Sequence, residues 1–165
     1  MAQTNFHNAD LAALEQQIEA GVPAQLREDY QKIVVAGMKA GLKGGPNSIL
    51  AQLRNSKDPL NDCVKGAVNL TSLLRRMSRN TMPIRAMIPA AMTLMLQALD
   101  FADRMGMVKV GKPEIAQATK LFADLIFQAN HITNAQLQQV AQKTQGVMNN
   151  PQQLQALRTH MKGVQ

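Results

Sequence analysis

The stretch PIRAMIPAAMTLMLQALDFADRM, residues 83–105, is the strongest indication of the fold class. Residues 84–99 within it are apolar around most of a helical circumference, a pattern typical of a helix buried at the centre of a protein. Residues 86–99 carry no charge, but this run is shorter than the about 20 residues needed to cross a membrane. We therefore expect a central apolar helix and no transmembrane span. Pro89 either kinks this helix or marks its true beginning.

Helix signals continue on the N-terminal side of this stretch. Asn8 or Asp10 can cap a first helix that Gly21 closes, and Asp58 followed by Pro59 predicts the start of a longer one. That longer helix carries one apolar stripe, formed by Leu60, Cys63, Val64, Ala67, Leu70 or Thr71, Leu74 and Met77.

Further helix signals follow on the C-terminal side, at Pro113, at Thr133 and at Pro151. We therefore predict an all-α protein, a compact bundle of about six or seven helices in a single domain over residues 1–165. Residues 131–165 are rich in Gln and poor in charge. Helices of this composition are weak in isolation, so we interpret this segment as a helical assembly arm that is ordered by packing.

Few residues in the chain suggest chemistry. Cys63 is the only cysteine and lies on the apolar stripe, which favours a small buried hydrophobe over a reactive thiolate. The three histidines are too widely separated in sequence to form a helical zinc pair. Asp100 and Asp103 lie one helical turn apart and are interpreted either as a cation or acid–base pair or, more simply, as a solvated face. We expect no enzyme activity, no metal and no cofactor.

The net charge of +7 is divided unevenly along the chain. Residues 1–29 have a net charge of −4, residues 30–86 have +8 and residues 87–165 have +3. The candidate acidic assembly edge is Glu15, Glu19, Glu28 and Asp29, and the candidate partner- or phosphate-binding cluster is Arg75, Arg76, Arg79 and Arg85. We expect Arg75 and Arg79 to lie one turn apart on the same helix. A solvated helix end, whose cations complement the helix dipole, is the alternative explanation.

Residues 82–150, which begin MPIRAMIPAAMTLMLQ, resemble small helical virion proteins of tailed bacteriophages, the internal or ejection and tail–portal components. The resemblance lies in helices rich in Met, Ala and Gln, with few aromatic residues. It implies a non-enzymatic structural protein that forms homo-oligomers and contacts other structural proteins, in the virion or in the host cytoplasm during assembly. The N-terminal sequence has no basic segment followed by an apolar one, so we expect no cleaved secretion signal, which agrees with that location.

Two functions remain open from the sequence. In the first, the acidic edge of one subunit faces the basic cluster of its neighbour in an assembly. In the second, the protein is a basic nucleic-acid-associated accessory protein that binds the phosphate backbone without sequence specificity. The charge division and the Met-rich helices favour the first, whereas only the net basicity favours the second.

Overall fold

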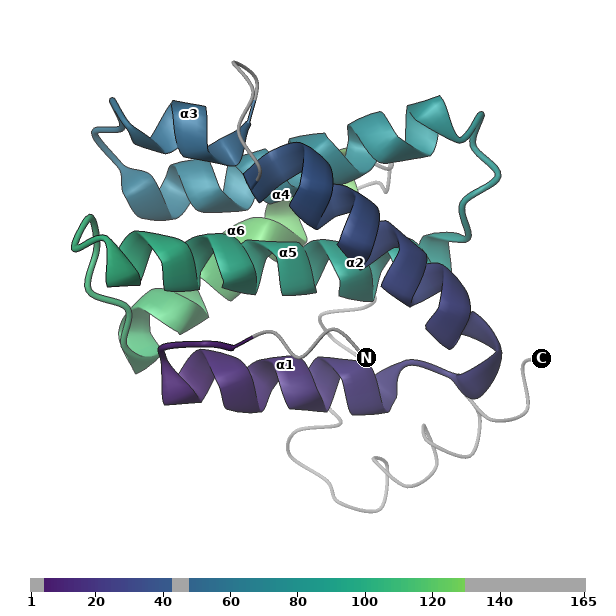
Figure 1. Cartoon of the computed structure of the whole chain (residues 1–165), viewed down its shortest axis with the longest axis horizontal. Helices are drawn as coiled ribbons and strands as arrows, with labels where there is room; N and C mark the ends of the chain where they lie inside the picture. The colour runs from purple at the N-terminus through teal and green to yellow at the C-terminus, as the bar shows by residue number, and fades with distance from the viewer. Residues whose placement is uncertain (1–4, 43–47, 130–165) are drawn as a thin grey trace. The chain divides into compact units, whose positions relative to one another are not determined.

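The computed structural model describes residues 5–42 and 48–129. Within these ranges the regular structure is entirely helical, so the all-α prediction is confirmed (Figure 1). The elements are α1 (Ala9–Gly21), the 3-10 turn η1 (Ala24–Leu26), α2 (Arg27–Leu42), α3 (Ile49–Leu53), α4 (Pro59–Met77), α5 (Ile84–Arg104) and α6 (Lys112–Ala129). The described residues up to Ile126 form one packed unit, which is described below. The predicted assembly arm lies outside the described residues, and one domain over residues 1–165 stays a prediction.

The helices begin where side-chain caps replace missing backbone partners. The Asn8 side chain accepts hydrogen bonds from the backbone N–H groups of Asp10 and Leu11, which confirms Asn8 as the cap of α1. Asp58 accepts from the N–H of Asn61, and Pro59 is the first residue of α4. Both starts therefore follow from local sequence alone.

Helix α5 is buried along most of its length and packs against α1, α2 and α4. Thirteen of its 21 residues are buried. It begins at Ile84, so Pro89 lies inside the helix rather than at its start. Among the described helices, α5 alone is long and apolar enough to cross a membrane, and 67% of its apolar window is buried inside the fold.

Two glycines let α2 approach α5 and α4 closely. A Cβ atom added at Gly37 of α2 would overlap the side chain of Leu94 on α5. A Cβ atom at Gly41 would lie 2.6 Å from Cδ2 of Leu70 on α4. The GxxxG spacing of these two glycines therefore serves helix packing within the chain.

A hydrogen-bonded clasp ties the start of α1 to the end of α5. Oδ1 of Asp100, a residue only 4% exposed, accepts from the backbone N–H groups of His7 at 2.9 Å and Asn8 at 2.8 Å. The Arg104 guanidinium donates to Oδ2 of Asp100 at 2.7 Å. Asp100 is therefore a buried, fully engaged carboxylate, and its interpretation as part of a solvated face is wrong.

Asp103 extends the same clasp to the segment before α6. The side-chain amide of Asn8 donates to Oδ2 of Asp103 at 3.0 Å and to the carbonyl oxygen of Val110 at 2.8 Å. Oδ1 of Asp103 accepts from the backbone N–H of Val110 at 3.2 Å. One asparagine thus caps α1 and also joins it to both ends of the α5–α6 connection.

The close approach at Gly37 predicts that Gly37→Ala destabilises the fold. Extra volume in a packed core costs about 1–3 kcal/mol, while the higher helix propensity of alanine recovers up to about 1 kcal/mol. Gly21→Ala is the matched control, because nothing lies within 4 Å of its added Cβ. Urea unfolding followed by circular dichroism measures both variants. If Gly37→Ala unfolds at the same midpoint as Gly21→Ala, the close packing of α2 on α5 is contradicted.

The clasp predicts that Asp100→Asn lowers the free energy of unfolding by about 2 kcal/mol, because hydrogen bonds to a buried charged acceptor are among the stronger ones. Asp124→Asn, on the exposed side of α6, makes the same chemical change and should shift stability by less than about 0.5 kcal/mol. Thermal unfolding of the two variants side by side tests this difference. Equal midpoints would mean that the clasp does not stabilise the fold.

Candidate interaction surface

Residues 78–83 form a hydrogen-bonded turn between α4 and α5. The backbone N–H of Asn80 donates to the carbonyl of Arg75 at 2.9 Å, and the Thr81 hydroxyl donates to the carbonyl of Ser78 at 2.7 Å. Arg79 and Asn80 both adopt left-handed backbone conformations, with φ of 54° and 60°. Two consecutive non-glycine residues in this region are uncommon, and they reverse the chain sharply.

This turn changes the predicted geometry of the arginine cluster. Helix α4 ends at Met77, so Arg79 lies beyond it, and the prediction that Arg75 and Arg79 share one helix face is wrong. Arg76, Arg79 and Arg85 are exposed, whereas Arg75 is half-buried. The helix dipole accounts for Arg75 and Arg76 in the last turn of α4, but it disfavours a cation such as Arg85 in the first turn of α5.

Exposed apolar side chains flank the same turn. Leu73 is 45% exposed, Met77 71% and Ile84 43%, and these are three of the five large hydrophobic side chains exposed in the described part of the chain. Leu73 and Met77 are one helical turn apart on α4, and Ile84 begins α5. Met77 is the last member of the apolar stripe predicted for α4, and its side chain is exposed at the C-terminal residue of that helix.

We call these side chains together the turn patch: Leu73, Met77 and Ile84 with Arg76, Arg79 and Arg85. Exposed apolar groups rimmed by charge are typical of surfaces that bind another molecule. Methionine and arginine are also enriched in protein–protein interfaces. The sequence predicted the arginines as a binding cluster. It did not predict that the apolar members are exposed, because helical periodicity does not show which apolar residues lie beyond the edge of the core.

The structure places two of the predicted acidic residues, Glu15 and Glu19, near Tyr30 of α2. Burial raises the pKa of the Tyr30 phenol, its hydrogen bond with Thr93 lowers it in part, and the charges of Glu15 and Glu19 raise it further. Glu28 and Asp29 immediately precede Tyr30 in the first turn of α2. We call Glu15, Glu19, Glu28 and Asp29 the acidic corner. Its residues lie on α1 and in the first turn of α2.

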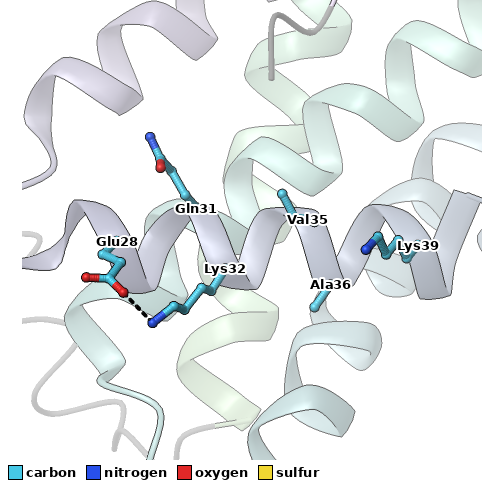
Figure 2. Close-up of a pocket in the computed structure, with 6 residues that line it drawn as sticks. All are labelled: Glu28, Gln31, Lys32, Val35, Ala36 and Lys39. Carbon is cyan, nitrogen blue, oxygen red and sulfur yellow. Dashed lines mark ion pairs between the residues drawn. The ribbon is translucent and has the colours of Figure 1, made fainter. Parts of the chain in front are cut away.

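Glu28 is partly neutralised within its own helix. Its carboxylate pairs with Lys32 one turn later, and this contact lowers the pKa of Glu28 and raises that of Lys32 (Figure 2). Both side chains are largely exposed, so the pair contributes little to stability. The pair borders a shallow hollow lined by Glu28, Gln31, Lys32, Val35, Ala36 and Lys39. All six lining residues come from α2, so the hollow lies on the surface of a single helix.

The cysteine and the described histidine have structural rather than chemical roles. Cys63 is fully buried, and burial raises the pKa of its thiol to about 12, so the thiol stays protonated at neutral pH. His7 donates its backbone N–H to the clasp. Among the described residues no group of three or more His, Cys, Asp or Glu side chains is placed to hold a metal ion. His131 and His160 lie outside the described residues.

Comparison with known proteins adds no functional assignment. No family model, no curated protein and no solved structure matches this chain. The turn patch and the acidic corner are therefore the features of the molecule that bear on its function.

Proposed function

We propose that this chain is a non-enzymatic assembly subunit that binds other protein subunits through the turn patch. The observation that supports this function is the gathering of Leu73, Met77 and Ile84 at the same turn as the exposed arginines. Side chains of this size each gain roughly 1.5–3 kcal/mol when full burial replaces full exposure. A partner that covers them removes apolar surface from water, which is the main driving force of most protein association.

The arginines of the patch give orientation more than affinity. Exposed ion pairs contribute about 0–1 kcal/mol each, whereas charge complementarity selects the partner and fixes the register of the contact. In this proposal the compact bundle around α5 acts as a rigid scaffold that presents the patch. The acidic corner is the complementary charged surface that the chain itself offers.

The proposed setting is the virion of a tailed bacteriophage, as an internal, ejection or tail-associated component. This part of the proposal depends on the resemblance of residues 82–150 to small helical virion proteins. In that setting the subunit contacts further copies and other structural proteins, and it is located in the host cytoplasm during assembly.

The exposed arginines and the net charge of +7 support a second candidate function, binding to the phosphate backbone of nucleic acid. Met77 and Ile84 are exposed beside the arginines, and their apolar side chains gain nothing from a phosphate backbone. The chain also contains only one Tyr, four Phe and no Trp, so aromatic stacking on single-stranded bases has few candidates. Protein association therefore explains more of the patch.

The assembly function predicts that the protein forms a defined oligomer and that Met77→Glu dissociates it, because a charge would replace the most exposed apolar side chain of the patch. Met105→Glu is the matched control: Met105 is 59% exposed but caps the opposite end of α5. Light scattering coupled to size exclusion gives the mass of each protein.

Two results would contradict the assembly function. One is a wild-type protein that is monomeric at every concentration, and the other is a Met77→Glu variant that assembles like the wild type. A monomer that binds double-stranded DNA with a steep dependence on salt would support the nucleic-acid function instead.

A further inference from the structure

We infer that the turn patch binds a second copy of this chain in a two-fold contact, in which the arginines of each copy meet the acidic corner of the other. This inference rests on the assembly function and specifies the partner and its orientation. It follows from where the structure places the two charged groups within one unit.

The end of α1 and the start of α2, which carry the acidic corner, lie at the same end of the unit as the α4–α5 turn, which carries the turn patch (Figure 1). They are joined by one buried cluster, which contains Val22, Tyr30, Ile33 and Val34 from the α1–α2 side and Ala86, Met87 and Ala90 from α5. Half-buried residues packed on this cluster include Ile18 and Leu26 beside the acidic corner, and Leu74 and Met82 beside the turn patch. The end of α1, the start of α2 and the α4–α5 turn therefore converge.

The placement of opposite charges at one end of the unit favours one symmetry over another. A head-to-tail array uses two different surfaces of each subunit, whereas a two-fold dimer uses the same surface on both subunits. A surface with an acidic half and a basic half is complementary to itself when a two-fold axis passes between the halves. Each dimer then contains the acidic–basic contact twice, with the apolar side chains of the patch between them.

The same placement disfavours a uniformly negative partner. A nucleic acid or an anionic membrane lying on Arg76 and Arg79 would also approach the carboxylates of Glu19 and Asp29, which repel it. A partner with alternating charge avoids this repulsion. The second copy offers that alternation, and it offers Leu73, Met77 and Ile84 to cover their own counterparts.

The test uses two charge-reversed variants of the full chain. Variant A carries Arg76→Glu and Arg79→Glu, and variant B carries Glu19→Lys and Asp29→Lys. In the two-fold contact each variant alone places like charges together twice, so each should weaken self-association at least about tenfold. A one-to-one mixture restores complementarity at both contacts. Native mass spectrometry should then show mainly a dimer of one A and one B.

Arg54→Glu with Lys57→Glu is the matched control for variant A. It makes the same change in net charge on exposed residues that precede α4, at the end of that helix opposite to Met77. This variant should dimerise like the wild type. Circular dichroism of every variant checks that the helical fold is retained.

The outcomes separate this inference from the function on which it rests. If Met77→Glu dissociates the oligomer while variants A and B assemble normally, the assembly function stands and the acidic–basic contact is overturned. Mixed oligomers that grow beyond two copies would overturn the two-fold arrangement in favour of a head-to-tail one. A wild-type protein that stays monomeric would overturn both, and loss of DNA binding by variant A with unchanged oligomers would assign the arginines to nucleic acid.

Discussion

Helix α5 is buried on several sides, and its burial determines where α1, α2 and α4 lie. Its apolar surface must be covered, and α1, α2 and α4 provide cover. Gly37 lets α2 approach closely enough to contact Leu94, and the clasp between Asn8 and Asp100 holds α1 along the same helix. Because these contacts fix the elements around α5, they also bring the acidic corner and the turn patch to one end of the unit.

Local signals predicted much of the fold. Asn8, Asp58 and Pro59 mark helix starts because a cap and its helix are adjacent in sequence. The clasp could not be predicted, because Asn8 and Asp100 are 92 residues apart and nothing local to Asp100 indicates a buried partner. Arg79 was misplaced for a different reason: the sequence continues as an acceptable helix past Met77, whereas the chain turns through left-handed conformations.

The structure gives Asp100 and Asp103 a stabilising role, since the oxygens of both carboxylates accept hydrogen bonds from Asn8, Arg104 and Val110. By contrast, most charged residues of the acidic corner and the turn patch are exposed, so a partner can reach them. The acidic and basic residues are far apart in the sequence, and folding brings the segments that carry them to one end of the unit. Exposed Met77 and Ile84 add the apolar surface that charge alone does not supply.

We propose that one end of this unit is a self-association surface made of both charged groups. Hydrogen–deuterium exchange of the wild-type protein at increasing protein concentration can locate such a surface. We expect amide protection to rise together in the α4–α5 turn and in the segment from the end of α1 to the start of α2, while protection of α3 is unchanged. Protection that rises in only one of the two segments, or that rises in α3 instead, would contradict it.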